Sequence, residues 1–176
     1  MRPDPATEYA PHHEKYVSLI TDPVLVALRD QRSEVVELFG SLTPEQGSLR
    51  YGEGKWTLRE VLGHIIDGDR VFGFRAFAFA RGEAASLPTY SPDGYVTNGG
   101  YDARSMQSLV AEFLAVRDSI IHLFDTLEPE AWTRGGMASN ARVSVRGLAY
   151  IAAGHAAHHI KIVRERYLDA DAAASS

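Results

Sequence analysis

The sequence predicts an all-α fold, a four-helix bundle with a long crossover between its second and third helices. Apolar residues recur at steps of three and four over four long segments, as on one face of an α-helix. No segment alternates apolar and polar residues as a half-buried strand does. A long stretch rich in glycine, proline, serine and tyrosine separates the second segment from the third. A bundle with one long connection accounts for all three observations.

The composition is that of a globular protein with one domain. The 176 residues are 45% hydrophobic and 23% charged, and we expect a single domain over 1–176, with a short N-terminal arm and a frayed C-terminal tail. No apolar run approaches the ~20 residues that span a membrane. The N-terminus lacks an apolar export segment, so a cytoplasmic location is expected. The net charge of −5 argues against a nucleic-acid partner.

The chain contains no cysteine. This excludes disulfides, thiolate metal ligands and a cysteine nucleophile. Thiol chemistry would therefore need a small-molecule thiol as a cosubstrate.

The first two helices have recognisable start signals. After an arm over 1–20 with a short helical turn, Asp22 is expected to cap a helix that has Pro23 at its first position and ends at Gly40. The second helix is expected to follow Trp56 and to run to about Gly82. A capping box formed by Thr57 and Glu60 marks its start. Within it, Gly68 and Gly73 cost ~1 kcal/mol each relative to alanine but allow close approach of a neighbour.

The second half of the chain contains two connections and two helices. Residues 83–101 form the long crossover, and a connection of this length is often functional. The third helix is expected over 102–127, and 128–143 form a second connection. Ser144 is expected to cap the last helix, which runs to about Leu168 before the tail 169–176.

Three histidines on two of these helices form a candidate metal site. His155 and His159 are four residues apart and so share one helix face, a spacing used by metal sites on helices. The long crossover allows the second and fourth helices to run in opposite directions. His64 then lies about 10 Å from one helix end and His159 about 14 Å from the facing end. The three imidazoles can therefore converge, although His158 could replace His159.

Three neutral imidazoles suit a divalent ion such as zinc, nickel or iron. Three protein ligands leave a coordination position open, as in catalytic sites, where the ion lowers the pKa of bound water or of a bound thiol. Asp67, one turn after His64, is a candidate hydrogen-bond acceptor for a metal-bound ring. We expect His12, His13 and His122 to be surface or packing residues. Candidate lid residues are Lys55, Trp56, Asp93, Tyr95, Asn98 and Tyr101.

The segments GKWTLREVLGHIIDGDRVF and VSVRGLAYIAAGHAAHHIKIVRERY resemble the DinB-like superfamily, including its YfiT-type members. The resemblance extends over nearly the whole chain. It implies a four-helix bundle with a divalent metal held by three histidines, which fall on His64, His155 and His159. Family members resemble metal-dependent hydrolases, or transferases that attach a low-molecular-weight thiol to small electrophiles. Dimers are frequent in the family, so a homodimer is one expected assembly.

Two classes of function follow as hypotheses. The first is a metalloenzyme that activates a low-molecular-weight thiol, or water, to attack a small-molecule substrate. The second is a non-catalytic metal- or ligand-binding bundle in a stress response, with a filled coordination sphere. A third and weaker hypothesis is a purely structural bundle whose histidines are core residues.

Overall fold

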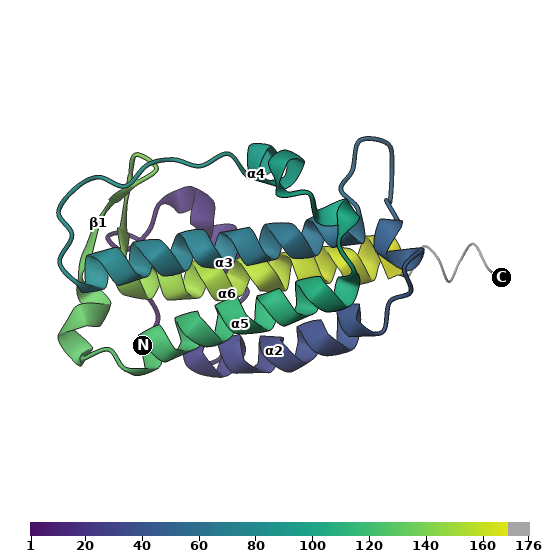
Figure 1. Ribbon diagram of the computed structural model, residues 1–176. Coiled ribbons are helices and arrows are strands. Elements are labelled where there is room, and N and C mark those ends of the chain that lie inside the picture. Colours follow the sequence, from purple (N-terminus) through teal and green to yellow (C-terminus); the bar gives the residue numbers. More distant parts are fainter. Residues whose placement is uncertain (169–176) are drawn as a thin grey trace.

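The computed structural model describes residues 1–168 and shows a four-helix bundle (Figure 1). Its four long helices are α2 (Val24–Gly40), α3 (Leu58–Ala80), α5 (Met106–Asp125) and α6 (Val145–Ile162). A single π-helical stretch, Val163–Leu168, follows α6. The predicted fold class is therefore confirmed. The predicted tail, 169–176, lies outside the described residues.

The direction of the helices follows from the long crossover. Figure 1 shows α3 and α5 starting at the same end of the bundle and running in parallel. Helix α6 starts at the opposite end and packs along α3, with which it shares its most extensive contact. The antiparallel pairing of the second and fourth long helices, on which the predicted histidine site depends, is present.

The crossover itself is more ordered than a loop. It contains the helix α4 (Pro92–Gly99) and a 3-10 turn, Tyr101–Ala103, and both were missed in the sequence. Ser91 caps α4 by accepting a hydrogen bond from the backbone N–H of Gly94 at 3.1 Å. Helix α5 then starts at Met106, later than the predicted residue 102, because Ser105 caps it.

A β-hairpin in the second connection contradicts the expectation that no strands form. Strands β1 (Gly135–Ala138) and β2 (Ala141–Ser144) pair antiparallel around a two-residue turn. Both turn residues, Ser139 and Asn140, have positive φ angles of 53° and 61°, as a type I′ turn requires. The crossover runs beside β1, since the N–H of Leu87 donates to the Met137 carbonyl at 2.8 Å. The hairpin thus holds the crossover against the bundle.

The N-terminal arm packs against the bundle. Its predicted helical turn is a 3-10 turn, Pro11–His13, followed by α1 (Glu14–Val17), which lies against α6. A Cβ added to Gly154 would lie 2.1 Å from the carbonyl oxygen of Tyr16, so only glycine allows this approach. The contact brings Tyr16 to the middle of α6.

The helix caps were predicted with mixed success. The capping box of Thr57 and Glu60 is confirmed, with reciprocal bonds of 3.1 Å and 2.7 Å. Ser144 caps α6, accepting from the N–H of Gly147 at 2.8 Å. The Asp22 cap was wrong: Pro23 itself occupies the N-cap position of α2, and no side chain caps that end.

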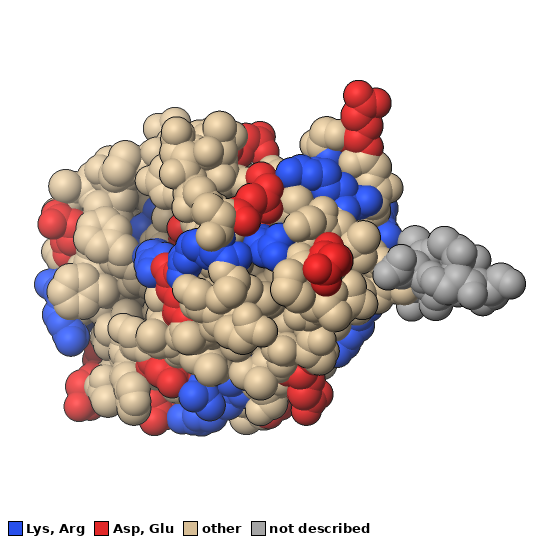
Figure 2. Space-filling view, turned by 45° about the vertical axis from the view of Figure 1, so that its right-hand side comes forward, with Lys and Arg blue, Asp and Glu red and all other residues tan. Residues whose placement is uncertain are grey.

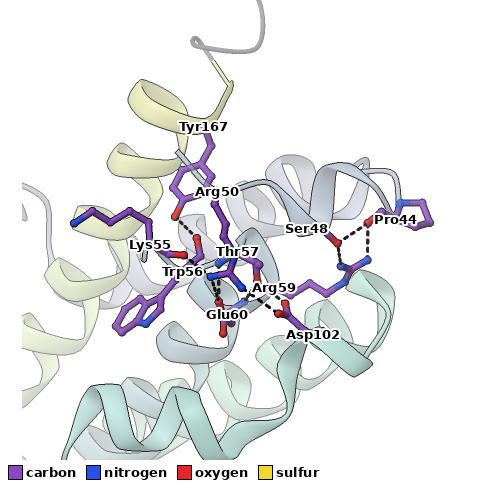
Figure 3. Close-up of polar contacts among 10 residues, drawn as sticks. All are labelled: Pro44, Ser48, Arg50, Lys55, Trp56, Thr57, Arg59, Glu60, Asp102 and Tyr167. Carbon is purple, nitrogen blue, oxygen red and sulfur yellow. Dashed lines mark hydrogen bonds and ion pairs between the residues drawn. The ribbon is translucent and has the colours of Figure 1, made fainter. Parts of the chain in front are cut away.

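The start of α3 is fixed by contacts from three parts of the chain (Figure 3). The hydroxyl of Tyr167, beyond α6, donates to the Trp56 carbonyl at 2.7 Å. The hydroxyl of Thr57 donates to Asp102 at 2.6 Å, and Arg50 lies 3.1 Å from Glu60. These bonds fix the height at which α3 begins relative to α6 and hold Trp56 at the junction.

Between two apolar clusters, the bundle contains a buried polar group that we call the ion-pair layer, formed by Asp69, Arg117 and Gln31. Neither Asp69 nor Arg117 has exposed surface. Arg117 donates to both carboxylate oxygens of Asp69, at 2.7 Å and 3.1 Å, and to the Gln31 side-chain carbonyl at 2.5 Å. Gln31 in turn donates to the Ala153 carbonyl of α6 at 2.8 Å. The layer therefore connects all four long helices.

The surface carries charges of both signs. On the face drawn in Figure 2, basic side chains are interrupted by acidic ones. Over residues 1–168, none of the helices is both long and apolar enough to cross a membrane.

Candidate metal centre

The structure brings His64 of α3 together with His155 and His159 of α6. One ring nitrogen from each lies within 4.8 Å of those of the other two. The Nε2 atoms of His64 and His155 are 2.9 Å apart, and the ring centroids of all three pairs lie 4.6–4.7 Å apart. We call these residues the histidine cluster. His158 lies beside it, its ring 5.2 Å from that of His159.

Small and aromatic neighbours define the position of the His155 ring. A Cβ on Gly68 would lie 2.7 Å from its Cε1 and 2.8 Å from its Nδ1, so this glycine makes room for the imidazole. Tyr16 and Phe72 meet the ring edge-on, with centroids at 5.5 Å and 5.6 Å. The close approach predicted for Gly68 therefore serves the histidine cluster directly.

Burial keeps the cluster neutral. It lowers the pKa of His64 from 6.5 to about 4, with Asp93 opposing the shift. Burial, together with the neighbouring His64 and His158, lowers the pKa of His159 to about 3. The pKa of the fully buried His155 is lowered well below its ordinary value for the same reasons. All three rings are thus unprotonated at neutral pH, the state in which imidazole binds a metal.

One pair of nitrogens in the cluster has a separation that suits a shared divalent cation. Two nitrogens bound at ~2.1 Å and at right angles would lie ~3.0 Å apart, close to the separation of His64 and His155. The same 2.9 Å contact also suits a hydrogen bond between two neutral rings. Nδ1 of His155, the ring nitrogen that does not face His64, is buried without a hydrogen-bond partner, and an ion bound at Nε2 would leave it unpaired. Metal binding by His64, His155 and His159 stays a prediction.

A cavity of about 420 Å³ opens onto the cluster. Besides the three rings, its lining includes His158, Tyr16 and Trp56, whose indole lies 4.7 Å from the His64 ring. His12 and His13 also line it, which the sequence interpretation missed by treating them as surface or packing residues. No periodic pattern pointed to these two histidines, because they lie in an arm whose position depends on tertiary contacts.

Arg75 and Ser139 are two further cavity residues that the sequence interpretation missed. Arg75 lies on α3 three turns beyond His64, and Ser139 is at the tip of the unpredicted hairpin. An arginine on an otherwise apolar helix face was the available signal for Arg75. No signal was available for Ser139 without recognition of the Ser-Asn turn.

Asp67 has other partners than the histidines. Its carboxylate accepts a hydrogen bond from the Tyr101 hydroxyl at 2.5 Å and lies 3.9 Å from the Arg70 guanidinium. The Tyr101 ring packs where Gly63 and Gly99 have no side chain, since a Cβ at either would approach it to 2.4 Å or less. Asp67 thus anchors the end of the crossover to α3, and its predicted contact with a metal-bound ring is not seen among its hydrogen bonds in residues 1–168.

Of the other candidate lid residues, Trp56 lines the cavity, whereas Tyr95 and Asn98 do not. The crossover does reach the cavity, but through Tyr90 and Pro92, and Trp56 joins them as predicted. The side chains of Tyr95 and Asn98 are exposed and lie outside the cavity lining.

Comparisons with known proteins agree with this architecture. The family model described as the DinB superfamily matches residues 27–163. YfiT from Bacillus subtilis, described as a probable metal-dependent hydrolase with an unusual four-helix bundle topology, superposes with a TM-score of 0.73 at 17% identity. The match covers 97% of this chain and 94% of that one. No curated protein sequence matches the chain.

A mycothiol-dependent maleylpyruvate isomerase superposes with a TM-score of 0.66 at 12% identity. The match covers 80% of this chain and 60% of the isomerase, so the isomerase has a further part without a counterpart here. At these identities the superpositions show the fold alone, whereas the family match covers most of the sequence. The chain therefore belongs to the DinB superfamily.

Proposed function

We infer that this protein is a divalent-metal-dependent enzyme in which His64, His155 and His159 hold the ion. The observation that carries the inference is the position of the cluster, with three neutral imidazoles converging at the wall of a 420 Å³ cavity. A structural metal site is closed by four protein ligands, whereas a catalytic site keeps a position for substrate. The described residues offer three ligands in one group, which favours the catalytic type.

The reaction class is activation of a small nucleophile. A divalent ion bound here would lower the pKa of a thiol or a water molecule in its open position. This chain's residues would orient the reactants: Trp56, Phe72 and, from the crossover, Tyr90 and Pro92 line the cavity and would form its walls.

A low-molecular-weight thiol is our first choice of nucleophile, and water is the second. With no cysteine in the chain, the sulfur must come from a cosubstrate. With a chloro-nitroaromatic acceptor, the thiol loses its proton to solvent, a carbon–sulfur bond forms, and the carbon–chlorine bond breaks to release chloride. The mycothiol dependence of the isomerase supports this choice, and the description of YfiT as a probable hydrolase supports water.

The test is an assay of chloride release from a chloro-nitroaromatic acceptor by metal-loaded protein, with and without a small thiol. We expect thiol-dependent turnover that is lost in His64→Ala and His155→Ala. The matched control is His122→Ala, since His122 is exposed on α5 and lies outside the cavity. Turnover without thiol would favour the hydrolase. Unchanged metal content in both cluster variants would contradict the metal site itself.

A further inference from the structure

Arg75 is a buried cation without an acidic partner. Arg75 is only 6% exposed, yet within residues 1–168 no carboxylate lies within 4.0 Å of its guanidinium. Of the two other buried arginines, Arg117 is paired with Asp69 through two hydrogen bonds, whereas Arg59 donates to the Ser48 hydroxyl and the Pro44 carbonyl and does not line the cavity. Burial of an unpaired charge is costly, so an arginine kept in this state calls for an explanation.

The contacts of Arg75 leave part of its guanidinium unused. Both of its hydrogen bonds come from Nη2, which donates to the Pro88 carbonyl at 2.8 Å and to the Ser139 hydroxyl at 2.7 Å. Nε and Nη1 have no hydrogen-bond partner in the described chain, and the residue lines the histidine cavity. The ring of Tyr90 lies against the guanidinium, with its centroid 5.7 Å from Cζ. The crossover and the hairpin tip thus hold the side chain in place while two donor atoms stay available.

The residues that line the cavity carry positive charge only, although the charge of Asp93, which is not among them, also acts on His64. Among the fourteen lining residues, all within the described part of the chain, none is acidic, whereas Lys15 and Arg75 are permanent cations. This contrasts with the protein as a whole, in which acidic residues outnumber basic ones by 23 to 18. An excess of cations in a hollow of an acidic protein favours an anionic ligand.

We propose that Arg75 is the anion-binding residue of the substrate pocket, and that the ligand carries a carboxylate at the end away from its reacting atom. The proposal rests on the proposed function, because it takes the histidine cluster as the reacting end. Nε and Nη1 lie on different edges of the guanidinium, so a carboxylate would accept a single charge-assisted hydrogen bond from one of them. His64 and Arg75 are separated by roughly 16 Å along the axis of α3, and the flexible arginine side chain spans part of this distance. The ligand is therefore an elongated molecule rather than a two- or three-carbon acid.

Two thiols of equal length test the proposal. 6-Mercaptohexanoate carries a carboxylate at its far end, and 6-mercapto-1-hexanol carries a neutral hydroxyl there. Their binding to metal-loaded protein is measured by calorimetry, and hexanoate is titrated in parallel into metal-free protein. The variants are Arg75→Gln and the charge-preserving Arg75→Lys. Arg70→Gln is the matched control, because Arg70 is on the same helix but pairs with Glu112 outside the cavity. Thermal unfolding establishes that each variant is folded.

We expect wild-type protein to bind the carboxylate thiol at least tenfold more tightly than the alcohol, since hydrogen bonds to charged groups contribute more than neutral ones. Arg75→Gln should remove this preference without weakening the alcohol, Arg75→Lys should keep part of it, and Arg70→Gln should keep all of it. A merely structural role for Arg75 would weaken both thiols equally and would overturn the proposal.

The proposed thiol activation at the metal and the proposed anion-binding role of Arg75 can be refuted independently of each other. If neither thiol binds metal-loaded protein but hexanoate binds metal-free protein in an Arg75-dependent way, thiol activation is refuted and the anion-binding role of Arg75 is supported. If both thiols bind through the metal with equal affinity in wild type, or if no carboxylate probe depends on Arg75, the anion-binding role is refuted and the metal centre is unaffected.

Discussion

The bundle contains two buried polar groups, and they differ in how their hydrogen-bonding capacity is met. In the ion-pair layer, Arg117, Asp69 and Gln31 satisfy one another and end on a backbone carbonyl of α6. In the histidine cluster, Nδ1 of His155 has no partner, and the facing nitrogens crowd together beside a cavity. Both groups connect α3 to α6, and they lie close along these helices.

The difference separates a structural polar group from a functional one. A closed set of hydrogen bonds fixes helix positions and needs nothing from outside. A group of ring nitrogens beside a cavity instead leaves room for a ligand, and the protein gains stability when that ligand binds. The ion-pair layer is thus the frame against which the rings of the cluster are held, and the following variants test this distinction.

The largest effect is expected from Arg117→Met. This change leaves the carboxylate of Asp69 buried without its partner, which costs about 3–5 kcal/mol. Urea denaturation of metal-free protein measures the loss. The double variant Asp69→Leu/Arg117→Met should recover most of it, because no charge is then stranded. A loss below about 1 kcal/mol for the single variant would show that the layer is not closed as described.

The histidine cluster should make the metal-free protein sensitive to acid. The folded-state pKa of His64 is lowered to about 4 from 6.5, so between these values the unfolded chain binds more protons. The corresponding stability is fully present above pH 6.5 and is lost as the pH falls towards 4. At ~1.4 kcal/mol per pKa unit, this single ring accounts for roughly 3 kcal/mol. Urea midpoints from pH 7 to 4 should fall less steeply in His64→Leu than in wild type, and parallel curves would contradict the burial of a neutral ring.

Metal should stabilise the protein through the cluster alone. At an ion concentration one hundred times Kd, the gain is about 2.7 kcal/mol, and a chelator should reverse it. We expect His155→Ala to lose the gain and His122→Ala to keep it, as measured by thermal unfolding with zinc or nickel. Equal metal stabilisation of both variants would place the ion elsewhere in the chain.

The smallest expected effect comes from Gly68→Ala, which displaces the ring of His155 without removing it. The added methyl group would lie 2.7 Å from the His155 ring, so the imidazole must rotate away. Metal affinity should fall about tenfold, as for other changes that reorient ligands. Competition with a chromophoric chelator measures this loss. Gly40→Ala is the control, because its Cβ would meet only Val36 at 3.9 Å, an ordinary contact.

The four helices and the histidine cluster could be predicted from the sequence because both depend on local periodicity. A spacing of four residues places His155 and His159 on one face, and the capping box of Thr57 and Glu60 fixes where α3 begins. From these, the matching depth of His64 followed by simple arithmetic. The metal assignment itself has not been tested by the structure.

The rest of the cavity could not be predicted because it depends on contacts between distant segments. His12 and His13 reach the cavity only because α1 packs on Gly154, and Ser139 does so only through a hairpin with a weak turn signal. Asp67 was predicted to accept a hydrogen bond from a metal-bound ring because it lies one turn after His64. Its hydrogen-bond partner is instead Tyr101, at the end of the crossover. Periodicity contains no information about such pairings.

The hydrogen bonds that connect Arg75 with the hairpin tip and the crossover have an evolutionary consequence. The rings of the histidine cluster belong to two long helices, whereas the far wall of the cavity comes from connections that are held together by hydrogen bonds of Leu87 and Ser139. Mutations that lengthen or shorten these connections, or that change their side chains, leave the spacing of the rings unchanged. Descendants of such a scaffold can therefore change which molecules they accept while retaining an inherited reaction centre.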